Sequence, residues 1–273
     1  QQYDVRSLKD LKAASKGVDA LYNLAAEHRD DVTPLSLYND VNVEGAKNTV
    51  EAAKANDIKK IIFTSSVAIY GLNKDCPDEN FPAEPFNEYG KTKWKAEKIF
   101  KAWNDSDNNN SLSILRPAVV FGERNRGNVY NLISQIDSGR FIMIGNGKNK
   151  KSMCYVGNIA HFLSMELEYS GYNVFNFCDK PDLTISEITD IIATCLERPI
   201  PKLKIPLSIG IVAAALFDLS AMIFGNKYSI SIIRIKKFCS ETTINTEKLK
   251  KRNYKAKYNL KQGIEKMIKS EFD

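Results

Sequence analysis

A tyrosine and a lysine four residues apart form the chemically most informative pattern of this sequence. Tyr89 and Lys93 belong to the run Asn87-Glu88-Tyr89-Gly90-Lys91-Thr92-Lys93, and their spacing places both side chains on one face of a helix. An ammonium beside a phenol favours the phenolate, so that a tyrosine with an ordinary pKa of about 10 becomes a usable proton acceptor. The pair therefore indicates chemistry that interconverts an alcohol and a ketone, and such chemistry needs a hydride carrier.

A serine hydroxyl is expected to complete this group. Ser66 closes the apolar run Ile61-Ile62-Phe63-Thr64-Ser65-Ser66, which is typical of a buried parallel strand. Ligands of open α/β sheets bind outside the carboxyl ends of the strands, which is where Ser66 would hold the reacting oxygen. The alternative is an ordinary helix surface, because Tyr-x-x-x-Lys by itself is a common spacing.

Composition narrows the class of protein. The chain has 273 residues, of which 43% are hydrophobic and 26% charged, as in a soluble globular protein with one substantial core or two small ones. His28 and His161 are the only histidines, which argues against a metal centre and against a Ser-His-Asp hydrolase. Five cysteines without a C-x-x-C pair, and no secretion signal, predict a cytoplasmic protein. No nucleic-acid partner is predicted.

Positive charge is concentrated near the end of the sequence. Residues 225–273 contain 13 Lys and Arg against 5 Asp and Glu, whereas residues 1–224 contain 26 against 28. The excess indicates either a solvated helical face or an anionic partner, namely a phosphate-bearing substrate or a lipid surface. The nearly continuous apolar stretch 205–224 precedes it and fits a core helix, an interfacial membrane-contacting helix or a spanning helix.

Alternating strands and helices predict an α/β protein with a Rossmann-like, doubly wound parallel sheet and a smaller C-terminal substrate-binding portion. No G-x-x-G-x-x-G loop occurs, so the glycine-loop βαβ unit is expected to precede Tyr3 in a longer protein. Strands are expected near 19–26, 59–66, 112–117, 141–144 and 173–177, and helices over 36–54, from 89 to about 103, and near 126–138, 155–169 and 184–197.

Several motifs in order make the chain resemble the extended short-chain dehydrogenase/reductases of the nucleotide-sugar epimerase/dehydratase group. They are Asp4-Val5-Arg6, Asn23-Leu24-Ala25-Ala26, Asn42-Val43-Glu44-Gly45-Ala46-Lys47-Asn48, Ser66 with Tyr89 and Lys93, Arg116-Pro117 and Phe121-Gly122. The resemblance implies NAD as cofactor and Ser66, Tyr89 and Lys93 as catalytic residues. It implies cofactor contacts at Asp4, Val5, Leu24, Ala25, Ala26, Asn42, Thr64, Ser65, Tyr89, Lys93 and Pro117.

The same family resemblance limits the type of reaction that is expected. Val67 and Ala68 stand where the dehydratase branch has an Asp-Glu pair, so elimination of water is not expected. Residues 122–130, 145–153 and 231–239 resemble bacterial enzymes that epimerise N-acetylglucosamine on an undecaprenyl-pyrophosphate carrier. This implies C4 epimerisation of a diphosphate-linked N-acetylhexosamine, through a 4-keto sugar, in the synthesis of surface polysaccharides such as the O-antigen of lipopolysaccharide. Substrate contacts are expected at Ser66, Val67, Arg124, Arg126, Asn128, Lys151 and Arg234.

The expected division places the dinucleotide-binding domain at 1–122 and 155–180 and the substrate-binding domain at 123–154 and 181–273. The expected partners are a sugar diphosphate, nucleotide- or undecaprenyl-linked, and a second copy of the chain, since relatives pair through the Tyr89 helix and the helix around 36–54. A peripheral contact with the inner face of the cytoplasmic membrane, through 205–224 and the basic tail, is also expected. The alternatives are an NAD(P)H-dependent keto-sugar reductase and a non-catalytic dinucleotide-binding protein.

Overall fold

The computed structural model describes residues 3–29, 32–201, 203–224 and 232–272. The chain forms two compact units. Unit 1 comprises Gln1–Ala118, Asn158–Cys178 and Ile244–Lys257, and unit 2 comprises Val119–Gly157, Asp179–Thr243 and Tyr258–Asp273. Residues 119–122, 155–157 and 179–180, expected in the dinucleotide-binding domain, lie in unit 2, and residues 244–257, expected in the substrate-binding domain, lie in unit 1. They belong to unit 1 because Leu249 is buried there and the Tyr254 ring packs 5.4 Å from that of Phe177.

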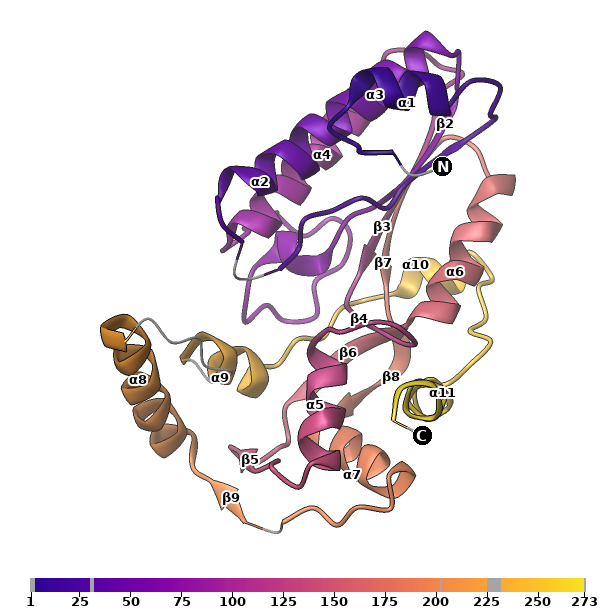
Figure 1. Ribbon diagram of the computed structural model, residues 1–273. Coiled ribbons are helices and arrows are strands. Elements are labelled where there is room, and N and C mark those ends of the chain that lie inside the picture. The colour runs from indigo at the N-terminus through magenta and orange to yellow at the C-terminus, as the bar shows by residue number, and fades with distance from the viewer. Residues whose placement is uncertain (1–2, 30–31, 202, 225–231, 273) are drawn as a thin grey trace. The chain divides into compact units, whose positions relative to one another are not determined.

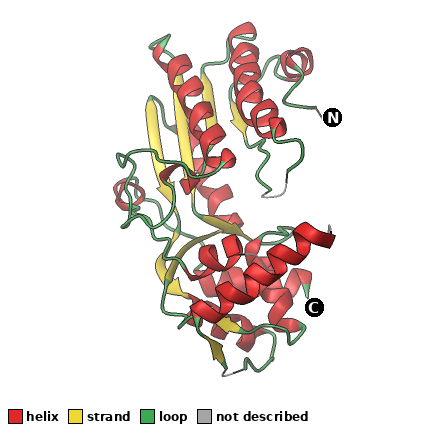
Figure 2. Cartoon of the chain, turned by 90° about the vertical axis from the view of Figure 1, so that its left-hand side faces the viewer, coloured by secondary structure: helices red, strands yellow, loops and turns green. Residues whose placement is uncertain are grey.

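Unit 1 is built on a sheet of four parallel strands in the order β1 (Leu21–Asn23), β2 (Lys60–Thr64), β3 (Ser111–Pro117) and β7 (Tyr172–Phe177). Figure 2 shows them as neighbouring yellow arrows. The apolar run of β2 does not alternate with polar residues, because a parallel sheet is covered on both faces. The α/β parallel fold predicted from the sequence is thereby confirmed.

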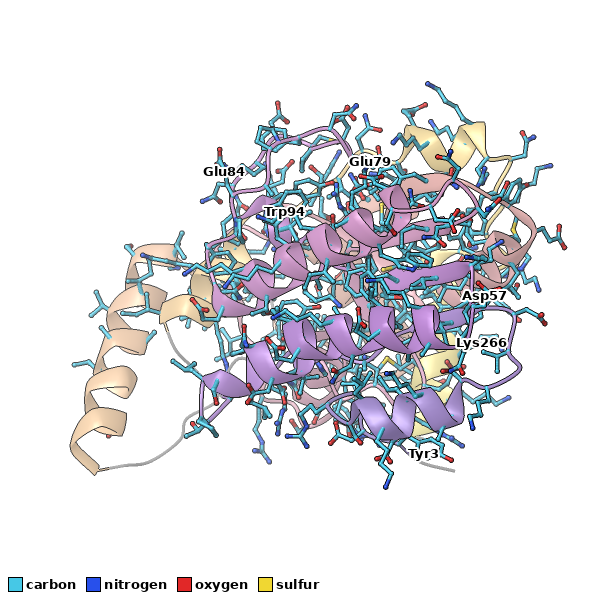
Figure 3. All side chains as sticks on the ribbon, turned by 90° about the horizontal axis from the view of Figure 1, so that it is seen from above. Tyr3, Asp57, Glu79, Glu84, Trp94 and Lys266 are labelled. Atoms are coloured by element: carbon cyan, nitrogen blue, oxygen red, sulfur yellow. The ribbon has the colours of Figure 1, made fainter. Side chains whose placement is uncertain are left out.

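Helices cover both faces of this sheet (Figure 1). α3 (Gly45–Ala55) and α4 (Glu88–Asp105) lie side by side on one face, as Figure 3 shows from above, with Trp94 on α4. α6 (Val156–Met165) lies on the other face, where the Phe162 ring packs 5.2 Å from that of Phe175. The core between α4 and β2 includes Phe100 and Phe63, whose ring centroids are 4.6 Å apart.

The segment expected as one helix over 36–54 is divided. It begins as α2 (Ser36–Tyr38), continues as a π-helix (Asn39–Glu44) and becomes α3. Such π-helical turns are rare and often mark functional sites. The other elements of unit 1 are α1 (Leu8–Ala14), which the sequence did not suggest, two 3-10 turns (Val67–Tyr70 and Glu166–Glu168) and α10 (Glu247–Lys251).

Unit 2 contains a second sheet that the sequence did not predict. Its strands are β4 (Val119–Phe121), β6 (Lys150–Tyr155) and β8 (Asp179–Thr184), with β4 parallel and β8 antiparallel to β6. β5 (Met143–Ile144) pairs separately with β9 (Lys204–Ile205). Its helices are α5 (Asn128–Asp137), α7 (Ile185–Cys195), α8 (Leu207–Phe224), α9 (Ile232–Cys239) and α11 (Leu260–Glu271).

α8 turns small residues inward and large apolar residues outward. Gly210 is buried so close to Ile144 that a Cβ on the glycine would lie 2.7 Å from the isoleucine Cγ2. Ile209, Val212 and Leu216, which follow helical spacing, are 57%, 63% and 65% exposed. A core helix would show the opposite pattern. Over the described residues, no helix has both the length and the apolar character needed to cross a membrane.

Candidate active site

Ser66 and Tyr89 meet at the carboxyl end of β2. Ser66 follows this strand and caps the 3-10 turn Val67–Tyr70 by accepting a hydrogen bond from the backbone N–H of Ala68 at 3.1 Å. The first turn of α4 lies against this segment, and a Cβ on Gly90 would come within 2.5 Å of the Ala68 carbonyl oxygen. Glycine at position 90 therefore permits the close approach. In this arrangement the Ser66 side chain lies close enough to the phenol of Tyr89 to lower its pKa.

The structure corrects the predicted electrostatics of Tyr89. Burial raises the pKa of this phenol, and the neighbouring Ser66 side chain acts in the opposite direction. The sequence had suggested that the neighbouring ammonium keeps Tyr89 ionised. Burial is instead the larger influence, because a charged phenolate loses its hydration inside the protein.

Lys93 is buried one helical turn beyond Tyr89, with only 1% of its surface exposed. Its Nζ donates a hydrogen bond to the Thr64 carbonyl oxygen at 2.6 Å and lies 4.2 Å from the centroid of the Phe63 ring. Burial lowers the pKa of Lys93 to about 7, and the charge of Glu97 acts in the opposite direction. Near neutral pH, Lys93 can therefore gain or lose a proton without leaving the site.

The carboxyl edge of the sheet in unit 1 offers groups that fit a nucleotide cofactor. Leu24 is 56% exposed just after β1, and Ala25 beside it is also exposed. Thr64 Oγ1, at the end of β2, is buried without a hydrogen-bond partner within the described part of the chain. An orphaned buried hydroxyl is costly unless a ligand or water satisfies it. This observation supports a bound polar group beside Lys93.

Other predicted cofactor residues have different partners. Asn42 is buried in the π-helix, and its side chain accepts from the Glu27 N–H at 2.8 Å and donates to the Glu27 carbonyl and to Thr92 Oγ1, both at 3.0 Å. Both amide hydrogens are thus used within the protein. Asn42 ties the loop after β1 to α4, so it positions the Tyr89 helix, and its amide hydrogens are already used.

The N-terminal cofactor candidates lie at the surface of unit 1. The Asp4 carboxylate accepts hydrogen bonds from the Arg6 backbone N–H and Nε at 2.9 and 3.0 Å, and these bonds lower the pKa of Asp4 to about 2. Val5 packs against Gly45, where an added Cβ would lie 2.9 Å from Val5 Cγ1. Asp4 therefore remains ionised, and Val5 is held by α3. Pro117 is buried at the end of β3.

A buried ion pair beside the site was missed by sequence reasoning. Glu97 accepts hydrogen bonds from Arg116 Nε at 3.0 Å and Nη2 at 2.7 Å, and also from the hydroxyl of Ser65. The Ser65 side chain, predicted to contact the cofactor, is thus directed to Glu97. The sequence did contain a signal for Glu97, because this residue continues the four-residue spacing of Tyr89 and Lys93 on one helix face.

Most of the predicted substrate residues lie in unit 2 and are held by their own chain. Arg126 forms an ion pair with Glu271, whose carboxylate also accepts from the Arg124 backbone N–H at 2.7 Å. Lys151 is 8% exposed and donates to the carbonyl oxygens of Lys237 and Ser240 at the end of α9. Lys151 thus caps a helix. Asn128 is exposed at the start of α5, Arg234 is exposed on α9, and Val67 lies in the 3-10 turn of unit 1.

Comparison with known proteins agrees with this architecture. Residues 1–178 match the family described as NAD dependent epimerase/dehydratase. The chain is 48% identical to the N-acetyl-alpha-D-glucosaminyl-diphospho-ditrans,octacis-undecaprenol 4-epimerase of Escherichia coli O157:H7, over 98% of this chain and 82% of that protein. It is 26% identical to the UDP-glucose 4-epimerase of Vibrio cholerae, over 75% of this chain and 65% of that protein.

Solved structures share the fold at lower identity. The UDP-glucose 4-epimerase of Thermotoga maritima, with UDP-glucose, superposes with a TM-score of 0.78 at 17% identity, covering 99% of this chain and 83% of that one. The UDP-N-acetylglucosamine 4-epimerase of Methanobrevibacter ruminantium gives 0.75 at 23% identity, covering 99% and 81%. Sequence family, fold and the site at the end of β2 agree. The chain therefore belongs to the NAD-dependent epimerase/dehydratase family of enzymes, as its resemblance to the extended short-chain dehydrogenase/reductases implied.

Proposed function

We propose that this enzyme interconverts the C4 epimers of an N-acetylhexosamine linked through a diphosphate to undecaprenol, with NAD as cofactor. The observation that carries the proposal is the position of Ser66 next to the phenol of Tyr89, with the buried Lys93 one helical turn further along α4, in a chain 48% identical to an enzyme named for this reaction. Elimination of water is not favoured, because Val67 and Ala68 offer no acid or base next to Ser66.

Each residue of the group has a distinct task in this proposal. Tyr89 takes the proton of the sugar 4-hydroxyl and later returns it. Ser66 donates a hydrogen bond to the oxygen that becomes the ketone, which stabilises the charge that develops there. Lys93 in its ammonium form stabilises the phenolate, and its pKa of about 7 keeps both of its protonation states accessible. NAD, when bound, supplies the chemistry of removing and returning a hydride at C4.

The proposal of an undecaprenyl carrier rests on the related Escherichia coli enzyme and not on the geometry of the site. The Escherichia coli enzyme is named for an undecaprenol-linked substrate, and this chain spans 82% of it. We infer that Arg124, Asn128 and Arg234 in unit 2 are candidates for contacts with the diphosphate. Arg126 would first have to leave Glu271, and Lys151 would have to release the end of α9.

The decisive experiment supplies the purified protein with N-acetylglucosamine linked either to undecaprenyl pyrophosphate or to UDP, and separates the epimeric products. We expect conversion of the undecaprenyl-linked sugar without net change in NADH absorbance. Conversion of the UDP sugar alone would contradict the lipid carrier. Stoichiometric formation of NADH, from oxidation of the C4 alcohol by NAD+, would identify a keto-sugar reductase acting in reverse instead, and conversion of neither sugar would refute the epimerase.

We further propose that the exposed face of α8 contacts the inner surface of the cytoplasmic membrane, where an undecaprenyl substrate resides. Ile209, Val212 and Leu216 present a continuous apolar strip, and the exposed cations Lys204, Arg234 and Lys236 lie on β9 and α9 of the same unit. An apolar strip flanked by cations suits a bilayer with anionic headgroups.

This contact can be tested by sedimentation with vesicles of phosphatidylglycerol and phosphatidylcholine. Replacement of Ile209, Val212 and Leu216 by Gln should abolish binding. Leu35→Gln, at a position in unit 1 that is 66% exposed, is the matched control and should bind like the wild type. Equal binding by the triple variant would exclude this face.

A homodimer is also proposed. The family resemblance implies pairing through the Tyr89 helix and the helix around 36–54, and α4 and α3 lie side by side on unit 1. Analytical ultracentrifugation at micromolar concentration should give twice the mass of the chain. A monomer at that concentration would refute the pairing.

A further inference from the structure

The short segment that carries Ser66 is tied at both ends to a single ion pair. At its start, the Ser65 hydroxyl donates to Glu97. At its end, the Tyr70 hydroxyl accepts a hydrogen bond from Arg116 Nη1 at 2.8 Å. Glu97 and Arg116 are themselves joined by two hydrogen bonds at 2.7 and 3.0 Å. Ser66 therefore lies between two anchor residues, Ser65 and Tyr70, which are both hydrogen-bonded to the same ion pair.

This ion pair joins two elements of unit 1 and is hydrogen-bonded to the 3-10 turn that ends at Tyr70. Glu97 belongs to α4, the helix of Tyr89, and Arg116 belongs to β3, the strand next to β2. Arg116 also donates to the Glu79 carbonyl at 3.0 Å, and Tyr70 donates to Asn176 Oδ1 on β7 at 2.7 Å. The network thus sets the position of the Ser66 segment relative to the helix that carries its partner, Tyr89.

The burial of this pair is difficult to explain by stability alone. Glu97 and Arg116 are 2% and 5% exposed. Taking two such charges out of water costs several kcal/mol per ion, and apolar residues of similar volume often stabilise a protein equally well. Positional specificity is what an ion pair with directed hydrogen bonds adds. None of its atoms belongs to the groups assigned to proton transfer.

We propose that Glu97 and Arg116 are positioning residues, which hold the Ser66 hydroxyl beside the phenol of Tyr89 through the anchors Ser65 and Tyr70. The inference rests on the proposed function, because it concerns the geometry of that same site. In this proposal Ser65 links Ser66 to α4, whereas the sequence suggested that Ser65 contacts the cofactor.

The test removes the hydrogen bond between Ser65 and Glu97 and compares the effect with the loss of an equivalent hydrogen bond elsewhere in unit 1. Ser65→Ala deletes the hydroxyl that donates to Glu97. The matched control is Ser113→Ala, because Ser113 donates at 2.7 Å to Glu166, a buried glutamate that is likewise paired with an arginine, Arg252. Both variants remove one hydroxyl that donates to a buried glutamate paired with an arginine, so their losses of stability should be similar.

The two variants should differ in catalysis. We expect Ser65→Ala to lower kcat roughly tenfold with unchanged KM for the sugar and unchanged affinity for NAD, because a displacement of a fraction of an ångström suffices for such a loss. Ser113→Ala should keep the wild-type kcat. In a Ser66→Ala background, Ser65→Ala should have no further effect, since the anchor acts only through Ser66.

Crystal structures of wild type and Ser65→Ala provide a readout that does not depend on turnover. The distance between Ser66 Oγ and Tyr89 Oη should be longer in the variant than in the wild type. If the wild type shows no epimerase activity, the proposed function fails, but this distance still decides whether the ion pair positions Ser66. An unchanged distance, an unchanged kcat, or an equal loss of kcat in Ser113→Ala would each overturn the inference.

Discussion

Replacing the buried lysine of the candidate site should make the protein more stable and inactive. Lys93 has a pKa of about 7 in the folded protein, compared with 10.5 for a solvated lysine. This difference corresponds to roughly 5 kcal/mol of destabilisation below about pH 7, since each pH unit is worth about 1.4 kcal/mol. Lys93→Met removes that cost but leaves the Thr64 carbonyl without its donor, which costs about 1–3 kcal/mol. The expected net gain is about 2–4 kcal/mol.

The dependence on pH provides a stricter test than the size of the gain. A folded pKa below the unfolded one means that the unfolded chain binds more protons between about pH 7 and 10.5, so wild-type stability rises with pH across this window. The wild type therefore loses stability as the pH falls toward 7, and below that value the cost is complete. The advantage of Lys93→Met should shrink by about 1.4 kcal/mol per pH unit above about pH 7.

Urea unfolding without NAD, followed by tryptophan fluorescence at about pH 6, 7.5 and 9, measures this difference. Lys91→Met is the control, because Lys91 lies on the same helix with half of its side chain exposed and pairs with Glu88. It makes the same chemical change without removing a buried ammonium. An advantage of Lys93→Met that stays constant across these pH values would refute the argument that desolvation of the ammonium is the cause.

Three further changes probe the site and its supports. Tyr89→Phe should reduce epimerase turnover at least about 10³-fold while the thermal unfolding temperature stays near the wild type; an active Phe variant would exclude Tyr89 as the proton acceptor. Asn42→Leu should lower the free energy of unfolding, measured in urea, by about 2–4 kcal/mol, because it leaves Thr92 and Glu27 without their buried partner. A loss below about 1 kcal/mol would contradict the role of Asn42 as a cross-link between the loop after β1 and α4. Gly122→Ala should lower the unfolding temperature, because Gly122 has φ +148° and an added Cβ would lie 2.3 Å from Val156 Cγ1; an unchanged temperature would show that this contact relaxes freely.

Local sequence patterns predicted much of unit 1. The unbroken apolar run of β2 and its hydroxyl end indicated a buried parallel strand, and the Tyr89–Lys93 spacing indicated one helix face. β3, β7 and α4 were also expected close to their observed bounds. Such features depend on residues within a few positions of one another, so periodicity reveals them. The sheet of unit 2 escaped prediction, because β4, β6 and β8 are short or irregularly patterned and are defined by pairing with distant segments.

Side-chain partners separated by long stretches of sequence were not predictable in this way. Lys151 resembled a phosphate ligand, yet it caps α9, 86 positions away. Glu97 and Arg116 looked like ordinary charges until packing brought them together with Ser65 and Tyr70. The outward-facing apolar strip of α8 could not be distinguished from a core helix, because the sequence is apolar on every side.

The sequence by itself determined the family and the parallel α/β fold and predicted the three reacting side chains, because these are encoded in residue type and short spacing. Tertiary structure decided their electrostatic state. Whether Tyr89 is stabilised as phenol or phenolate, and whether Lys93 keeps its proton, depends on how much water the fold excludes. Desolvation is a property of the packed chain as a whole, and no local pattern of residues specifies it.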